Sequence, residues 1–253
     1  MKAARILREK IASGRIVTGV LATDLLWPAL VEYLRKADYD YLVIDLEHGA
    51  HPEHQVSEVC ALARMVDFPV LIRPIDSDYA TIRRTIDFGP CGCLLPSVES
   101  AAALDEVRDG IYLPPRGRRR PGGPGNYWVD DFRYETWKRE VEDYFIVLPQ
   151  IETRQGLANA DAIASHEITT AIAIGPYDLS ADLGVCGIMD APQLREAIEV
   201  IRRAGERAGK TMWRIGDGPT LAAEGFTFLC IAEPMAALKE ALEERNRATR
   251  EKG

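Results

Sequence analysis

Eight short apolar runs recur along this chain, and most are separated by segments with the apolar spacing of a helix. Strands that alternate with helices pair in parallel through right-handed crossovers. Eight such units in 253 residues is the usual size of a closed (β/α)8 barrel. The predicted strands are Ile16–Thr23, Tyr41–Leu46, Val70–Ile75, Gly92–Ser97, Phe145–Glu152, Thr170–Gly175, Thr211–Ile215 and Phe226–Ile231.

The helical segments follow the spacing i, i+3, i+4 that buries one face of a helix. They are Leu26–Arg35, Pro52–Met65, Ala80–Asp87, Ala101–Arg108, Leu157–Ser165, Pro192–Ala208, Thr220–Glu224 and a final helix, Met235–Lys252. A doubly wound open sheet is the alternative, but no glycine-rich nucleotide turn follows any predicted strand. We find no linker, so the whole chain, 1–253, is predicted to be one α/β domain, a (β/α)8 TIM barrel.

Charge and composition disfavour several classes of partner. The formal net charge of −8 argues against nucleic acid or an anionic membrane. No apolar stretch is long enough to span a bilayer, and the first residues lack the apolar core of a secretory signal, so a cytoplasmic location is expected. The five cysteines fit neither a zinc spacing nor a disulfide framework.

The segment Ile111–Tyr144 breaks the strand–helix rhythm. Its prolines and glycines disfavour regular structure, and a loop of this length in a compact domain is often functional. Arg116 and the run Arg118–Arg120 either form a solvated basic loop or include a residue that meets an acidic substrate. The aromatic stretch Asn126–Trp137 is expected to line or cover the pocket.

Two carboxylates stand where consecutive apolar runs end. Glu152 follows one predicted strand, and Asp178 follows the next. Carboxyl ends of parallel strands meet at one edge of a sheet, and paired carboxylates suit a hard divalent cation such as Mg²⁺ or Mn²⁺. The alternatives are that Asp178 caps a helix and that Glu152 lies in an exposed turn.

Polar residues also follow the second and third predicted strands. Asp45 precedes His48 by three residues, and a carboxylate that holds one imidazole nitrogen leaves the other free to act as a base. Arg73 interrupts an apolar strand, which is costly unless the guanidinium is paired. A buried acid is one possible partner, and a substrate carboxylate or enolate is the favoured one. His51 and His54 are assigned to the following loop and helix rather than to a zinc site.

Pro176, Tyr177 and Asp178 open a strand-to-helix turn. Backbone N–H groups in such a turn point at anions. A small substrate carboxylate is therefore expected to bind at these three residues while Asp178 also contacts the metal.

Taken together, these strand ends and the segments around them resemble the HpcH/HpaI family of class II pyruvate aldolases. They occur in the family's order and cover about residues 16 to 185. The matching segments are Tyr39–Gly49, Ile72–Pro74, Ile86–Gly89, Leu95–Glu99, Pro114–Arg119, Gln150–Thr153 and Gly175–Ser180.

The resemblance implies a (β/α)8 barrel with a Mg²⁺, Mn²⁺ or Co²⁺ ion held by Glu152 and Asp178. It implies that His48 is the base, working with Asp45 and a metal-bound water, and that Arg73 stabilises an enolate.

The same resemblance implies further roles outside this group. Gln150 would face the metal-site pocket, and Arg119, which matches the arginine after the family's Pro-Pro phrase, is expected among the substrate-binding residues. The family usually assembles as homo-oligomers, specifically hexamers, in which the last helix is exchanged between neighbours. Asp87 matches an aspartate near such a subunit contact.

The expected function is a metal-dependent lyase that cleaves or forms a 4-hydroxy-2-oxo acid, with a small-molecule 2-oxo acid (pyruvate) and an aldehyde as partners. One alternative is a citrate-lyase-like, citrate-synthase-like or oxaloacetate-decarboxylating enzyme acting on an oxo acid or acyl-CoA. A non-catalytic binding protein is disfavoured because the carboxylates and His48 are retained. The phrase Ala232–Met235 departs from the family's usual Gly-Ser/Thr-Asp and leaves the substrate open.

Overall fold

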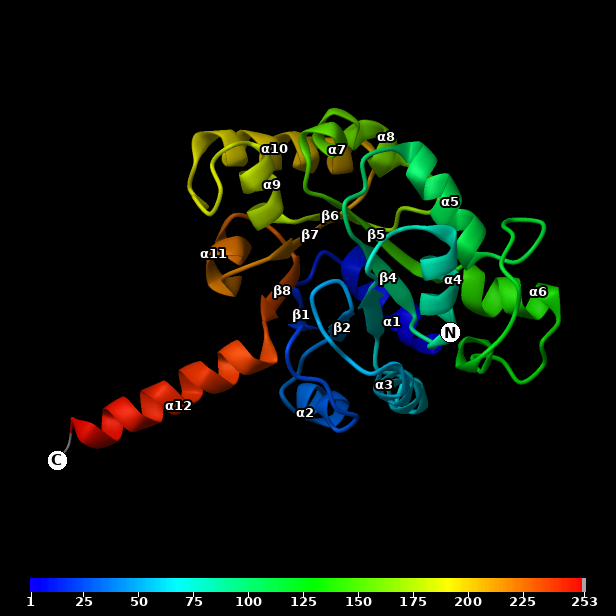
Figure 1. Cartoon of the computed structure of the whole chain (residues 1–253), viewed down its shortest axis with the longest axis horizontal. Helices are drawn as coiled ribbons and strands as arrows, with labels where there is room; N and C mark the ends of the chain where they lie inside the picture. The colour runs from blue at the N-terminus through cyan, green and yellow to red at the C-terminus, as the bar shows by residue number, and fades with distance from the viewer. Residues whose placement is uncertain (252–253) are drawn as a thin grey trace.

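The computed structural model describes residues 1–251 and forms a closed barrel of eight parallel strands (Figure 1). Neighbours around the barrel are neighbours in sequence, and β1 closes the ring against β8. The predicted (β/α)8 barrel is confirmed, and each strand begins and ends within two residues of its predicted bounds. The strands are β1 (Val17–Ala22), β2 (Tyr41–Asp45), β3 (Val70–Arg73), β4 (Gly92–Leu95), β5 (Ile146–Ile151), β6 (Ile172–Ile174), β7 (Met212–Ile215) and β8 (Phe228–Ala232).

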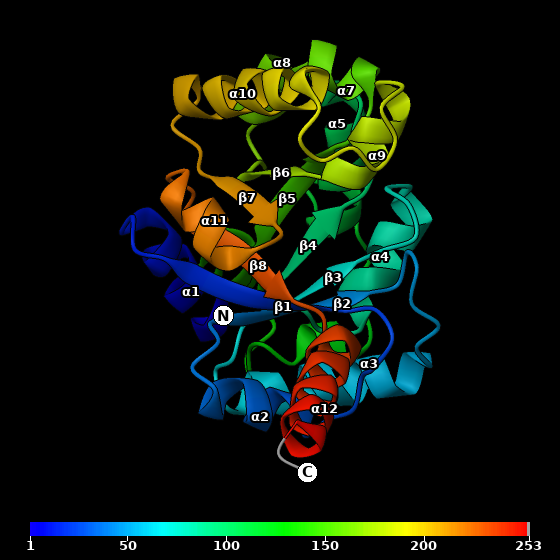
Figure 2. The same ribbon diagram turned by 90° about the vertical axis from the view of Figure 1, so that its left-hand side faces the viewer.

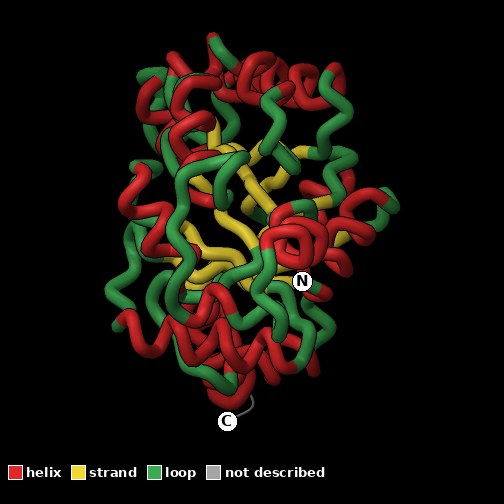
Figure 3. Tube along the Cα trace, turned by 90° about the vertical axis from the view of Figure 1, so that its right-hand side faces the viewer, coloured by secondary structure: helices red, strands yellow, loops and turns green. Residues whose placement is uncertain are grey.

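Helices surround the strands (Figures 2 and 3). The predicted helix over 157–165 is split into two, and the helix Pro176–Asp182 was not predicted. The predicted end of the last helix at Lys252 lies outside the described residues. The helices are α1 (Lys2–Ala12), α2 (Leu30–Lys36), α3 (Glu53–Met65), α4 (Tyr79–Asp87), α5 (Ala101–Ile111), α6 (Tyr134–Trp137), α7 (Arg154–Ala158), α8 (Ala160–Ser165), α9 (Pro176–Asp182), α10 (Pro192–Arg207), α11 (Gly218–Ala223) and α12 (Pro234–Arg250), with short turns η1 (Pro124–Asn126) and η2 (Lys138–Glu142).

Large side chains from alternate strand positions fill the barrel interior. Tyr41 is fully buried; its hydroxyl donates to the Leu229 carbonyl oxygen at 2.8 Å and accepts from Trp213 Nε1 at 2.7 Å. Its ring meets Phe228 edge-on, with ring centroids 5.2 Å apart. A Cβ on Gly19 would come within 2.1 Å of the Tyr41 ring, so this strand position accepts only glycine. The interior is therefore a packed core rather than a channel.

The opposite face of the strands packs against the helices. Leu42 and Ile44 of β2 are buried in one cluster with Val56, Val59 and Ala63 of α3. Both faces of β2 are thus apolar, which explains why the strand reads as an uninterrupted apolar run in the sequence.

Helix α1 lies at the amino ends of the strands. Arg8 Nη1 donates to the carbonyl of Phe145, the residue before β5, and Lys10 pairs with Asp40, the residue before β2. Leu7, on the inner face of the same helix, is fully buried. This element was missed because it precedes the first strand and lies outside the repeating strand–helix pattern.

Helix α12 leaves the barrel and extends away from it (Figure 1). None of its residues is buried, and Met235, Leu238 and Leu242 expose apolar side chains. Within residues 1–251, no helix combines the length and the apolar character needed to cross a membrane.

Replacing Tyr41 with Phe is expected to destabilise the barrel by about 1–3 kcal/mol, because Trp213 Nε1 and the Leu229 carbonyl lose their buried partner. Urea unfolding of Tyr41→Phe beside Tyr33→Phe measures this. Tyr33 is 64% exposed and serves as the control. Equal unfolding free energies for the two variants would contradict a structural role for the interior hydroxyl.

Candidate active site

Asp45 and Arg73 form a buried ion pair at the carboxyl ends of β2 and β3. The two residues lie opposite one another in the strand register. Arg73 Nε donates to Asp45 Oδ1 at 2.8 Å, and Nη2 donates to Oδ2 at 2.7 Å. Asp45 is fully buried and Arg73 is 7% exposed. Two parallel hydrogen bonds of this kind fix the guanidinium plane as well as its position.

Other donors occupy the remaining lone pairs of Asp45. Thr23 Oγ1 donates to Oδ2 at 2.9 Å, and the backbone N–H groups of Glu47 and His48 donate to Oδ1 at 3.0 and 3.3 Å. Burial alone would raise the pKa of the Asp45 carboxyl, but the hydrogen bonds and charge of Arg73 outweigh it and hold that pKa below its usual value. Asp45 is thus an ionised anchor for Arg73.

This arrangement corrects the expectation that Asp45 orients the His48 imidazole. Asp45 accepts the backbone N–H of His48, and its carboxylate is already committed to Arg73. The imidazole Nε2 instead lies 3.7 Å from Oε2 of Glu47, and that same oxygen lies 3.2 Å from Arg73 Nη1. The His48 side chain is 57% exposed, so the imidazole is accessible from solvent.

Glu47 is the functional candidate that sequence reasoning missed. Burial raises the pKa of its carboxyl; the Arg73 charge opposes that shift, and the nearby Glu152 charge adds to it. An acidic residue directly before His48, after an apolar strand, was the available signal. It was passed over because position alone does not show which of two neighbouring carboxylates faces the imidazole.

Glu152 follows β5 and is held from two sides. Its Oε1 accepts from Ser97 N at 2.6 Å and from Ser97 Oγ at 2.9 Å, while Gln150 Nε2 donates to Oε2. A Cβ on Gly175, at the end of β6, would lie 2.1 Å from Oε2, so glycine is required beside this carboxylate. Glu152 is only 4% exposed.

Asp178 lies in the first turn of α9, inside the helix rather than at its cap, which is Gly175. Burial raises the pKa of the Glu152 carboxyl and outweighs the hydrogen bonds from Ser97; the Asp178 charge raises it further. Joint binding of a cation by these two acids stays a prediction.

The donor set at these strand ends fits a hard divalent cation. A buried carboxylate with a second acid beside it is unfavourable unless positive charge is supplied. Gln150 Oε1 is also buried without a hydrogen-bond partner. Among residues 1–251, no three His, Cys, Asp or Glu side chains are arranged to hold a metal by themselves. Two carboxylates that leave positions for water and substrate match the habit of Mg²⁺.

The turn predicted to bind a substrate carboxylate opens α9. Pro176 is the first residue of the helix, where its missing N–H is tolerated. Tyr177 is 61% exposed. Substrate contact at this turn remains a prediction.

Arg119 lies in a separate environment. Its side chain is fully buried; Nη2 donates to Asp87 Oδ1 at 3.1 Å and to Asn126 Oδ1 at 3.2 Å, and the guanidinium stacks 5.4 Å above the Trp137 ring centre. These contacts bind the loop to α4 rather than to Glu152. Its predicted contact with substrate, like the placing of Asp87 at a subunit contact, stays a prediction.

The aromatic segment, Asn126–Trp137, does not cover the carboxyl ends of this chain's own strands, contrary to the expectation from the sequence. Trp128 and Trp137 enclose a cavity of only about 10 Å³ together with Met1 and Phe145. Phe145 directly precedes β5, so this cluster lies toward the amino ends. Apolar burial orders the segment, which forms η1, α6 and η2 despite its prolines and glycines.

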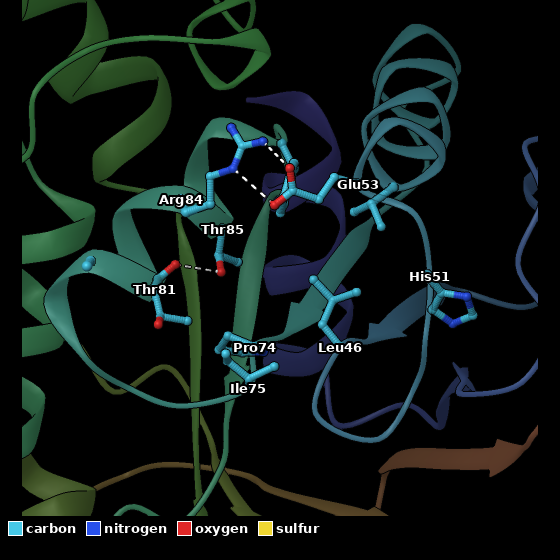
Figure 4. A pocket seen from close by; sticks show the side chains of 11 residues that line it. Leu46, His51, Glu53, Pro74, Ile75, Thr81, Arg84 and Thr85 are labelled. Atoms are coloured by element: carbon cyan, nitrogen blue, oxygen red, sulfur yellow. Dashed lines mark hydrogen bonds and ion pairs between the residues drawn. The ribbon is translucent and has the colours of Figure 1, made fainter.

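A mainly apolar pocket of about 340 Å³ lies beside the site, between α3 and α4 (Figure 4). Leu46 and Pro74, which follow Asp45 and Arg73 in sequence, line one side, and the Glu53–Arg84 ion pair lies across from them. The charged groups of this pocket pair with each other, so it lacks the free carboxylates of the strand ends.

In a comparison with known proteins, residues 23–228 match the family model described as HpcH/HpaI aldolase/citrate lyase. A hydroxypyruvate/pyruvate aldolase from Pseudomonas aeruginosa is 31% identical over 94% of this chain and 90% of its own. A 2-keto-3-deoxy-L-rhamnonate aldolase from Shigella boydii serotype 4 (strain Sb227) is 27% identical over the same shares of the two chains.

A solved structure agrees with these sequence matches. The crystal structure of an HpcH/HpaI aldolase from Desulfitobacterium hafniense DCB-2 superposes with a TM-score of 0.88 at 27% identity. The match covers 97% of this chain and 97% of that one.

Replacing Glu152 with Gln is expected to stabilise the metal-free protein above neutral pH by about 1 kcal/mol. A carboxyl whose pKa is raised on folding stabilises the fold below the unfolded pKa, and this contribution is lost as pH rises through the folded pKa. Urea unfolding of wild type and Glu152→Gln, in chelator at about pH 5 and about pH 8, measures the difference. If the difference in unfolding free energy between the two proteins does not grow with pH, the assignment of Glu152 as an unfavourably buried carboxylate is contradicted.

Proposed function

Because this chain belongs to the HpcH/HpaI aldolase/citrate lyase family, we propose that it cleaves and forms 4-hydroxy-2-oxo acids, with pyruvate and an aldehyde as the products of cleavage. The family assignment confirms the predicted carbon–carbon lyase of the aldolase class. The aldolase names of the two relatives support the reaction.

The observation that carries this proposal is the buried Glu152 carboxylate, held by Ser97 and Gln150 on the barrel edge that also holds Arg73. Glu152 and Asp178 would hold a Mg²⁺, Mn²⁺ or Co²⁺ ion, with Gln150 beside it. When bound, such an ion supplies Lewis-acid polarisation of a 2-oxo acid. None of the described strands delivers a lysine to its carboxyl end, so the site does not support a Schiff-base route.

Arg73 stabilises the negative charge that develops on the oxo-acid half. Asp45 holds two of its nitrogens, Nε and Nη2, and the guanidinium is therefore oriented before substrate arrives. Nη1 lies 3.2 Å from Glu47 Oε2, the oxygen that also faces His48. A preoriented cation costs little reorganisation during the reaction.

The His48 imidazole moves the proton. In the cleavage direction it takes the proton of the C4 hydroxyl, and the C3–C4 bond breaks to release an aldehyde. The electron pair of that bond remains with the 2-oxo acid fragment of the substrate, as an enolate next to Arg73. Return of a proton to C3 then gives pyruvate and balances the reaction.

The citrate-lyase-like and oxaloacetate-decarboxylating alternatives stay untested. The matching family model covers aldolases and citrate lyases together, whereas both sequence relatives described above are aldolases. That difference favours the aldol reaction and leaves the aldehyde open.

Exchange of the C3 protons of pyruvate for deuterium, without any aldehyde, tests the proposal. With Mn²⁺ the wild-type protein is expected to catalyse exchange, and chelation or Glu152→Gln is expected to slow it by about 10²-fold or more. Glu53→Gln, which removes an exposed carboxylate on α3, is the matched control. Exchange that survives both chelation and Glu152→Gln would refute the metal-dependent mechanism.

We also propose that the chain forms a homo-oligomer, with a hexamer as the family expectation, through exchange of α12. Support comes from the exposed Met235, Leu238 and Leu242 on a helix that buries nothing in its own barrel. A Leu238→Glu/Leu242→Glu variant is expected to shift the mass measured by light scattering toward the monomer. An unchanged mass would contradict the role of this helix.

A further inference from the structure

Ser97 adopts an unusual backbone conformation at the end of β4. Its φ is +48°, in the left-handed region that residues other than glycine rarely enter. Ser97 follows Pro96 directly after the strand and is exposed toward solvent. A strained residue of this kind persists only where its surroundings hold it, and such residues cluster at functional sites.

The conformation turns two donors of one residue toward the same acceptor. Ser97 N and Ser97 Oγ lie 2.6 and 2.9 Å from Oε1 of Glu152, a residue from the neighbouring strand. Gln150 holds the other carboxylate oxygen, and Gly175 leaves the space that the carboxylate fills. Both oxygens of Glu152 are therefore positioned before any cation binds.

We infer that Ser97 is a positioning residue for Glu152, whose left-handed turn fixes the orientation of this carboxylate for cation binding. The inference rests on the proposed function, in which Glu152 holds the metal. Groups that hydrogen-bond a metal ligand commonly change metal affinity by 10–100-fold when removed. The hydroxyl and the N–H act together, so loss of the hydroxyl leaves one of the two contacts.

A purely local role makes a different prediction. If the serine only completes the turn after β4, glycine would replace it without loss, because glycine enters the left-handed region freely. Ser97→Gly keeps the backbone N–H and the turn but removes the hydroxyl. Ser97→Ala removes the same hydroxyl and keeps a side chain at the strained position.

Binding of Mn²⁺ to the full chain without substrate, followed by the electron paramagnetic resonance signal of free Mn²⁺, tests the inference. Ser97→Gly and Ser97→Ala are each expected to raise the Kd for Mn²⁺ by about tenfold. The unfolding midpoint of metal-free Ser97→Gly should stay within a few degrees of wild type. Ser77→Ala, which removes a hydroxyl that donates to the Pro96 carbonyl and not to Glu152 among the described residues, is the control and should bind as wild type.

Wild-type Mn²⁺ affinity in both Ser97 variants overturns the inference. Glu152→Gln separates this result from failure of the proposed function, because it should abolish binding whatever Ser97 does. If Glu152→Gln binds Mn²⁺ as wild type does, the metal assignment fails and the role of Ser97 fails with it.

Discussion

Unbalanced negative charge at the carboxyl ends of the strands is the constraint on which the rest of the site depends. Asp45 and Arg73 neutralise each other, but no basic side chain among residues 1–251 pairs with Glu152. Burial of the Glu152 carboxylate near the Asp178 charge is unfavourable, and burial raises the pKa of Glu152. Proteins keep such groups where function needs them, at some expense in stability.

The parallel barrel was predictable because each of its strands is buried on both faces and reads as a short apolar run. The same reading placed Asp45, Arg73 and Glu152 at strand ends, since an apolar run that stops at a charged residue marks the end of a buried strand. The pairing of Asp45 with Arg73 needed the register of β2 against β3, which spacing along one chain does not reveal.

Other features depend on contacts between distant segments. Ser97 gives no sign in the sequence of its left-handed φ, because that conformation is stabilised by Glu152, which follows another strand. Glu47 and Asp45 both carry a carboxylate, and only the structure shows which of them faces the His48 imidazole. Trp137 likewise lines a small cavity with Met1, a residue far away in the sequence.

Diffraction from crystals soaked in Mn²⁺, with anomalous data at the manganese edge, tests the central claim most directly. The account predicts one strong anomalous peak in contact with the carboxylates of both Glu152 and Asp178. A peak that touches neither carboxylate, or an ion-free site in which a basic side chain occupies the space between them, would contradict it.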